Sequence, residues 1–483
     1  MRLLWVLLVC SFSVVCFAEE PIAVEADHAT YEGGTLYLKG AVHLVHDLGT
    51  IEAEEVSIES AENGKINQLG SVKMERQVCF AMRGGGEFNC AKAVLLRKEM
   101  CGRFYGNDDG IGVSFVEMVK GKRNMLVPLT VKSRMMEMQI GCVESCRYID
   151  KIVAIDDVAV DYNQTFTLTS AIATYSRVPK LEGESSIVKT LPGTILLEPS
   201  PGEHCHATNI QGDAIKASKI VIDSNKREMH FNQPKGTIST LSDKIPVLFS
   251  SNLLIWDLSN KLLKLTGSVT VEQAPVGLCK SNKAMHISYV ESKGKNELRT
   301  IESFGKTYLH HYGIEKRGDQ HLSCGGRAFI DHEHLVAILE CAHDGSGNVV
   351  PGSEVHFRDA MAELKGQKIT ITYALVNGKM VAVKALAEGD VSLLGAKRDK
   401  GRCYYALADC VEYFPDKQEV VCSSSQSGRV LFYDKINSLR ISAPGVIVKR
   451  EAKKESIQGI GDVRLSFADT ELSEFKKHFN MDK

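Results

Sequence analysis

One short pattern recurs along the chain: an apolar residue at every second position, interrupted by a glycine at the centre. Alternate residues of an extended chain point to the same side, so each copy predicts a half-buried β-strand. A glycine inside a strand indicates a bend, a bulge or a close backbone approach. The clearest copy is Leu36, Leu38, Gly40, Val42 and Leu44. A second copy is Leu263, Leu265, Gly267, Val269 and Val271, and a weaker one is Ala385, Ala387, Gly389, Val391 and Leu393. Looser copies are centred on Gly70, Gly305 and Gly461.

A second pattern places an alanine two positions after an apolar residue and resumes the apolar spacing after a gap of three. Its copies are Ile51, Ala53, Val56 and Ile58; Ile215, Ala217, Ile220 and Ile222; and Ile441, Ala443, Val446 and Val448. The change from a spacing of two to a spacing of three shifts the apolar side by one residue, as a β-bulge does. Any all-β chain contains strands with alternating apolar residues. The alternative interpretation is therefore that these recurrences are ordinary strands and not copies of one structural unit.

Turn residues separate short alternating runs along most of the chain, which predicts an all-β fold. The clearest hairpin surrounds Asn377-Gly378, a dipeptide that favours tight hairpin turns. One helix is expected, at the C-terminus from Asp469 to Phe479. Clusters of turn residues predict a division into regions 19–200, 201–345 and 346–483.

The first 18 residues have the pattern of a secretory signal peptide: one arginine, an apolar run and a small-residue end at Ala18. Cys16 raises the alternative of an acylated lipoprotein, although the preceding Val15 is larger than such processing prefers. No later stretch is apolar for long enough to predict a membrane helix. The sequence therefore predicts an exported chain.

The net charge of −2, from 58 Lys+Arg against 60 Asp+Glu, gives no indication of nucleic-acid binding. Two of the 14 cysteines, Cys10 and Cys16, lie in the predicted signal peptide. The remaining even number in an exported chain predicts several disulfides, with Cys142 and Cys146, and Cys403 and Cys410, close in sequence.

Two groups of polar residues are candidate metal or catalytic sites. The run Glu203-His204-Cys205-His206 offers metal ligands, but neighbouring residues of an extended chain point to opposite sides. His310-His311, and His332 and His334 beside Asp331 and Glu333, offer groups for hydrolysis or metal binding, although such pairs are usually surface loop residues. We predict no metal, no cofactor and no enzymatic activity.

The quoted strands resemble the OstA/LptA family of lipopolysaccharide-transport proteins. The similarity is carried by residues 26–31, 36–44, 49–58 and 66–72, and again by 215–222 and 261–271. It implies tandem β-jelly rolls in the periplasm, possible association with the inner or outer membrane, and an open apolar interior for acyl chains. It also implies contacts with other envelope transport components through edge strands and head-to-tail self-association.

The expected function is therefore a periplasmic bridge that binds lipopolysaccharide or a related glycolipid during transport to the outer membrane. The alternative is a structural or protein-docking β module of the cell envelope without lipid cargo, in which the same inward residues fill a closed core. The candidate lipid-lining residues are Leu36, Leu38, Val42, Leu44, Leu263, Leu265, Val269 and Val271.

Overall fold

The computed structural model shows an all-β chain, which confirms the predicted fold class. It describes residues 23–46, 48–60, 69–83, 85–107, 112–120, 126–143, 146–162, 164–181, 188–239, 246–274, 276–292, 295–312, 319–359, 362–376, 379–397, 401–425, 428–435, 439–450 and 455–465. The predicted signal peptide and the predicted helix from Asp469 to Phe479 lie outside these residues. Within the described ranges, no helix is long and apolar enough to cross a membrane.

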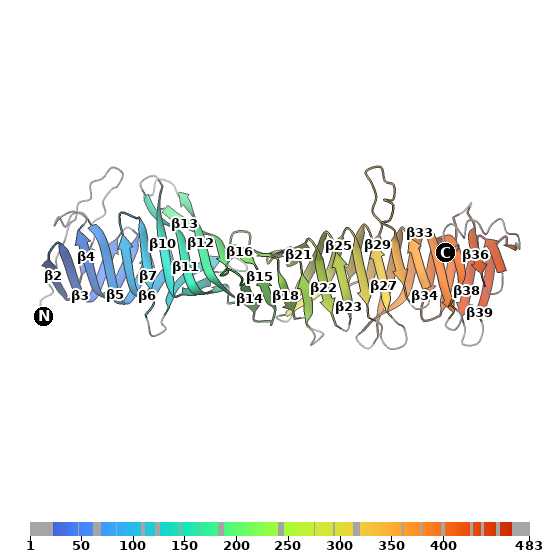
Figure 1. Cartoon of the computed structure of the whole chain (residues 1–483), viewed down its shortest axis with the longest axis horizontal. Helices are drawn as coiled ribbons and strands as arrows, with labels where there is room; N and C mark the ends of the chain where they lie inside the picture. The colour runs from blue at the N-terminus through green and yellow to red at the C-terminus, as the bar shows by residue number, and fades with distance from the viewer. Residues whose placement is uncertain are drawn as a thin grey trace. The chain divides into compact units, whose positions relative to one another are not determined.

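The chain divides into two compact units, each built from antiparallel strands (Figure 1). Unit 1 comprises residues 1–236 and 254–260, and unit 2 comprises residues 237–253 and 261–483. The division into three regions inferred from turn residues stays a prediction.

Unit 1 contains strands β1 to β17 and β20. Their bounds are β1 (Ala23–Glu25), β2 (His28–Glu32), β3 (Thr35–His46), β4 (Gly49–Ser60), β5 (Leu69–Met82), β6 (Glu87–Leu96), β7 (Cys101–Tyr105), β8 (Val113–Lys120), β9 (Leu126–Ser133), β10 (Met135–Val143), β11 (Cys146–Tyr162), β12 (Phe166–Leu181), β13 (Val188–Glu198), β14 (Cys205–Asn209), β15 (Ala214–Ala217), β16 (Lys219–Asp223), β17 (Glu228–Asn232) and β20 (Leu253–Asp257).

The boundary between the units falls within β18 (Lys235–Ile238). The strands of unit 2 are β19 (Val247–Ser250), β21 (Leu262–Thr266), β22 (Val269–Gln273), β23 (Gly277–Ser281), β24 (Ala284–Ser292), β25 (Lys295–Phe304), β26 (Thr307–His311), β27 (Gln320–Cys324), β28 (Arg327–Asp331), β29 (Val336–Glu340), β30 (Val355–Arg358), β31 (Ala362–Gly366), β32 (Lys368–Val376), β33 (Lys379–Lys397), β34 (Gly401–Phe414), β35 (Glu419–Ser423), β36 (Val430–Asp434), β37 (Leu439–Ala443), β38 (Gly445–Arg450), β39 (Glu455–Ile460) and β40 (Arg464–Leu465).

In each unit the strands form two rows whose apolar sides face each other. In unit 2, row A runs β19, β22, β23, β26, β27, β30 and β31 and continues through the second half of β33. Row B runs β21, β24, β25, β28, β29 and β32 and continues through the first half of β33. The chain makes a hairpin in one row and then moves to the other, which gives a jelly-roll arrangement of antiparallel neighbours.

Unit 1 has the same two rows, but its long strands bend and belong to both. The first half of β3 pairs with β2, whereas its second half pairs with β1. Row A then runs through β4, β5, β6, β8 and β9, and row B through β4, β5, β6, β7 and β10. A single bent strand can therefore contribute inward side chains to both rows.

The repeated glycines mark the corners at which the chain leaves one row for the other. Gly40, Gly267 and Gly389 have φ values of 77°, 69° and 78°. Residues with a Cβ rarely adopt this backbone conformation. A Cβ at Gly40 would lie 2.5 Å from Asp27 Oδ2, and one at Gly267 would lie 2.5 Å from Asn252 Nδ2. The corner therefore requires glycine for two reasons: its backbone conformation and a polar side chain packed against it.

The looser copy at Gly70 has a different role. Ser60 pairs with Leu69 and Glu59 pairs with Ser71, so Gly70 is the extra residue of a bulge. The corner of β5 instead lies at Arg76 and Gln77, whose φ values are 62° and 51°. Gly70 is therefore a bulge, whereas Gly40 and Gly267 are corners.

The predicted change of phase in the alanine-containing pattern is confirmed. In β4 the register with β5 shifts between Glu52 and Glu55, an interval that contains Ala53 and ends one residue before Val56. In the other two copies the strand ends after the alanine and a new strand begins two residues later, in the opposite row. All apolar members of the three copies are buried. The strands expected on either side of Asn377-Gly378 are antiparallel partners, with Val376 opposite Lys379, while the two turn residues lie outside the described ranges.

The structure shows no disulfide among the cysteines that it describes. Ten of them are free thiols: Cys79, Cys90, Cys101, Cys142, Cys205, Cys279, Cys324, Cys341, Cys410 and Cys422. Cys142 and Cys146, which are close in sequence, are not direct cross-strand partners, because Cys142 lies opposite Arg147 and Cys146 lies opposite Val143. Burial raises the pKa of Cys90 and of Cys422 to about 12, which keeps both thiols protonated.

Candidate functional site

The eight candidate lining residues all lie on β3, β21 and β22, four in each unit. Leu38, Val42 and Leu44 in unit 1, and Leu263, Leu265 and Val269 in unit 2, are each at most 5% exposed. Leu36 and Val271 are partly exposed. The alternation therefore predicted correctly which side of each strand points inward, while lipid binding by these residues stays a prediction.

The interior of unit 1 is filled by aromatic rings contributed by both rows. Phe88 of row A stacks on Phe104 of row B, with ring centroids 4.2 Å apart and planes 3° from parallel. Phe80 and Phe115 pack beside them, and the ring centroids of Phe115 and Tyr175 are 6.1 Å apart. All four phenylalanines are at most 2% exposed. Large stacked rings leave little free space between the two rows of this unit.

A buried ion pair lies beside these rings. Arg177 Nη2 of β12 lies 2.7 Å from Glu117 Oε1 of β8, and the two side chains are 1% and 6% exposed. The Tyr175 hydroxyl donates to Glu117 Oε2 at 2.7 Å, and Arg177 Nη2 also donates to the Gly85 carbonyl at 3.3 Å. Loss of hydration raises the pKa of Glu117, and the Arg177 charge and the Tyr175 hydroxyl oppose that shift.

Sequence reasoning missed this pair, although a signal for it was present. In β8, Val113, Phe115 and Val119 are buried on one side, and Glu117 shares their spacing. A charge on the apolar side of a strand indicates a buried partner, since an unpaired buried charge is too costly. The partner, Arg177, is 60 residues away, so only the fold identifies it.

The beginning of unit 2 has the same two rows but smaller inward residues. In row A, Val271, Cys279 and Leu309 are direct cross-strand partners. In row B, Ile287 and Ile301 are direct partners. All five side chains are partly exposed, as is Ile330 beside Ile301, whereas Leu263 beside Ile287 and Leu322 beside Leu309 are 5% and 6% exposed. We call these five residues the open stretch.

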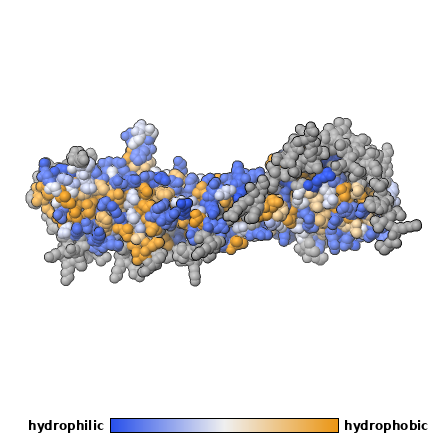
Figure 2. Space-filling model, turned by 180° about the vertical axis from the view of Figure 1, so that it is seen from behind, coloured by the Kyte–Doolittle hydropathy of each residue, from blue (hydrophilic) through white to orange (hydrophobic). Residues whose placement is uncertain are grey.

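Beyond the open stretch, the interior of unit 2 closes. Leu309 and Ile330 pack against a continuous buried core that contains residues from both rows, including Leu322, Leu339 and Phe357. Figure 2, which views the molecule from behind, shows hydrophobic side chains reaching the surface among hydrophilic ones over unit 2, in the left half of the picture. The open stretch is thus an apolar surface that continues into a closed core.

The polar groups singled out in the sequence are mostly structural. Cys205 is buried, whereas His204 and His206 beside it are exposed, so the run Glu203 to His206 does not converge on one point. Asp331 accepts hydrogen bonds from the backbone N–H groups of Glu333 and His334, which closes the β28–β29 turn. Its contact with His334 Nδ1, at 2.8 Å, raises the pKa of that histidine.

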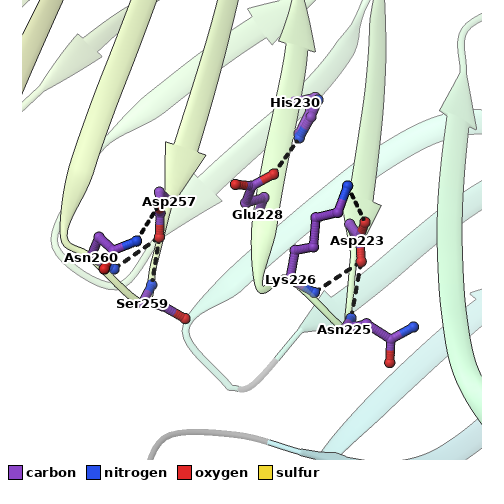
Figure 3. Close-up of polar contacts among 8 residues, drawn as sticks. All are labelled: Asp223, Asn225, Lys226, Glu228, His230, Asp257, Ser259 and Asn260. Atoms are coloured by element: carbon purple, nitrogen blue, oxygen red, sulfur yellow. Dashed lines mark hydrogen bonds and ion pairs between the residues drawn. The ribbon is translucent and has the colours of Figure 1, made fainter.

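The same turn geometry recurs at two places in unit 1, which supports a structural role for Asp331. Asp223 accepts from the backbone N–H groups of Asn225 and Lys226, and Asp257 accepts from those of Ser259 and Asn260 (Figure 3). An aspartate that bonds the backbone two and three residues later stabilises a tight turn without any ligand. His332 and His334 therefore belong to a hairpin turn.

Comparisons with known proteins leave the family open. No protein-family model matches the chain, and no curated protein matches it. Among solved structures, it is similar to LptH, the LptA homologous periplasmic component of the conserved lipopolysaccharide transport device from Pseudomonas aeruginosa. The two are 11% identical, the match covers 31% of this chain and 94% of LptH, and the TM-score is 0.23. A similarity of this size does not assign a family.

Proposed function

We propose that this protein binds an acyl chain of lipopolysaccharide or a related glycolipid in the periplasm and contributes to its transport toward the outer membrane. The open stretch is the observation that carries the proposal. Its residues are partly exposed, lie in both rows and border a buried apolar core. They are Val271, Cys279 and Leu309 in row A and Ile287 and Ile301 in row B. The resemblance of the strands around Gly40 and Gly267 to the OstA/LptA family supports the same cargo.

The energetics suit reversible binding. Complete burial of a leucine, isoleucine or valine side chain is worth about 1.5–3 kcal/mol. The side chains of the open stretch are already partly buried, so covering each of them with a lipid chain contributes only a fraction of that amount. Several such contacts together hold an acyl chain against water while still permitting its release.

Partner contacts through strand edges form a second part of the proposal. Among the described residues, β1 and β2 each pair only with β3, and β39 pairs only with β38. Unpaired backbone groups at such edges can accept a strand from another molecule. We propose that these edges contact other envelope transport components or further copies of this chain.

The test uses photo-crosslinking residues in the exported full chain. Crosslinkers at Leu309 and Ile301 should capture lipopolysaccharide or a related glycolipid. A crosslinker at Phe88, in the filled interior of unit 1, and one at Thr270, which points outward between Val269 and Val271, serve as matched controls and should capture none. Absence of lipid at Leu309 and Ile301 in folded protein would favour the alternative, a structural or docking module.

A further inference from the structure

Three potential metal ligands converge on the outer side of row A in unit 2. His310 of β26 and His321 of β27 are direct cross-strand partners, and Asp319 lies just before β27. One ligand atom from each of the three side chains lies within 4.8 Å of the other two. No other such group is found among the residues that the structure describes.

The two imidazoles are held by specific contacts. His310 Nε2 lies 2.9 Å from Asp319 Oδ2, and the centroids of the two imidazole rings are 4.3 Å apart. The Tyr308 hydroxyl lies 2.8 Å from His321 Nδ1. When Nδ1 carries the proton and donates to Tyr308, Nε2 of His321 has a free lone pair, which is the usual way in which an outer partner prepares a metal-binding histidine.

A further aromatic residue supports His310. The Tyr312 ring packs edge-on against the His310 ring at 4.8 Å, and its hydroxyl donates to Glu272 Oε1 at 2.9 Å. His310 is 20% exposed and Asp319 is 53% exposed, so an ion can reach the group from solvent. Supporting contacts on both imidazoles distinguish this group from an isolated surface histidine.

We propose that His310, Asp319 and His321 bind a divalent transition-metal ion, with Zn²⁺ the ion of best fit. Two imidazole nitrogens and one carboxylate oxygen are a common zinc ligand set, with a water in the fourth position. Nitrogen ligands disfavour Mg²⁺ and Ca²⁺, which prefer oxygen. An ion bound by Nε2 of His310 would take the place of the hydrogen bond between that nitrogen and Asp319, and the imidazole N–H would then be on Nδ1.

The surrounding charges set the strength of this site. Asp319 supplies one negative charge to the ion, and Glu272 lies behind Tyr312. Arg358 of β30 lies opposite His321, and Lys280 of β23 lies opposite Tyr308, so two positive side chains lie on the neighbouring strands. We therefore expect a site that needs all three ligands, because the local charge does not by itself attract a cation.

A bound ion would connect β26 to β27 across the outer side of the strands whose inward residues include Leu309. This inference does not depend on lipid binding, since the metal ligands and the open stretch are on opposite sides of row A. Metal binding and lipid capture can thus fail separately, and crosslinking at Leu309 in the presence of EDTA tests lipid binding alone.

The experiment is equilibrium dialysis of the full chain, stripped with EDTA, against Zn²⁺. We expect about one tightly bound Zn²⁺ per chain and its loss in the variant His310→Ala/His321→Ala. The matched control, His204→Ala/His206→Ala, removes two exposed histidines and should bind as the unchanged protein does. Retained binding by His310→Ala/His321→Ala, or no tight binding by the unchanged protein, would overturn the proposal.

Two milder variants keep the test decisive if the double variant does not fold. Asp319→Asn removes the anionic ligand, and Tyr308→Phe removes only the partner of His321 Nδ1; we expect Tyr308→Phe to weaken binding by about tenfold or more. Unchanged affinity in both variants contradicts the site. Co²⁺ in place of Zn²⁺ should show an absorption spectrum without a thiolate charge-transfer band; such a band would place the metal on the free cysteines instead.

Discussion

In row A of each unit, inward-pointing residues on neighbouring strands are direct cross-strand partners. The two units share this arrangement but differ in the size of the side chains. In unit 1, Phe80, Phe88 and Phe115 are consecutive cross-strand partners in row A. In unit 2, the corresponding kind of ladder consists of Val271, Cys279 and Leu309. Three closely packed rings fill the space between the rows, whereas the smaller side chains leave their own surfaces partly exposed.

This difference shows that a two-row framework does not determine whether its interior is open. The backbone pattern decides which residues point inward, and the volumes of those residues decide whether solvent or a ligand reaches them. The buried pair of Glu117 and Arg177 strengthens the contrast, since an ion pair inside unit 1 is incompatible with an apolar path for lipid at that point. The proposal of lipid binding is therefore placed on the open stretch of unit 2 and not on the interior of unit 1.

The largest effect is expected from breaking the buried ion pair of unit 1. Arg177→Met leaves Glu117 buried without its partner and should lower the free energy of unfolding by about 3–5 kcal/mol. Unfolding in urea can be followed by the fluorescence of Trp256, which packs on Phe166 within unit 1. The chain has 2 tryptophans, and the other, Trp5, lies in the predicted signal peptide.

Two further variants serve as controls for this prediction. Glu117→Leu/Arg177→Met removes both charges and should recover most of the lost stability. Arg134→Met breaks an exposed ion pair with Asp157 and should cost about 0–1 kcal/mol. A loss for Arg177→Met no greater than that for Arg134→Met would show that the interior of unit 1 is hydrated.

A pair of leucine truncations tests the packing difference directly. Leu129→Ala removes a fully buried leucine of unit 1 and should cost about 2–5 kcal/mol through lost burial and a cavity. Leu309→Ala removes a partly exposed leucine of the open stretch, so its cost should fall at or below about 2 kcal/mol. Urea unfolding followed by circular dichroism measures both costs. Equal values would mean that the interior at Leu309 is as closed as the interior at Leu129.

The smallest effect concerns acid sensitivity in unit 2. Burial lowers the pKa values of His286 and His332 below the ordinary 6.5, with nearby acids opposing the shift. The folded state therefore prefers the neutral imidazoles, and their contribution to stability is present above pH 6.5 and is lost as the pH falls through the lowered folded pKa values.

The measurement compares urea midpoints at about pH 7.5 and pH 5.0, a range in which histidine is the main titrating side chain. The protein should be less stable at the lower pH. The variant His286→Gln/His332→Gln, which cannot gain these protons, should show a smaller difference between the two conditions. An unchanged pH dependence in this variant would contradict the role of the two histidines.

The sequence alone predicted many of the strands, the sides of these strands that point inward, and the bends at Gly40, Gly267 and Gly389. Leu38, Val42 and Leu265 are buried as their spacing predicts, and the glycines between these residues lie at corners. These properties follow from alternation along the strand and from the conformational freedom of glycine, both of which are local. Gly70 shows the limit of local information, since the same glycine-centred spacing there accompanies a bulge.

What lies opposite each residue depends on the tertiary fold. Glu117 meets Arg177, and His310 meets His321 and Asp319, because strand register brings together residues that are far apart in the chain or separated by a turn. Register also separates Cys142 from Cys146, which are close in sequence. Whether the interior is filled depends on the summed volumes of side chains from two facing rows, and a pattern read along one strand contains no information about the row that faces it.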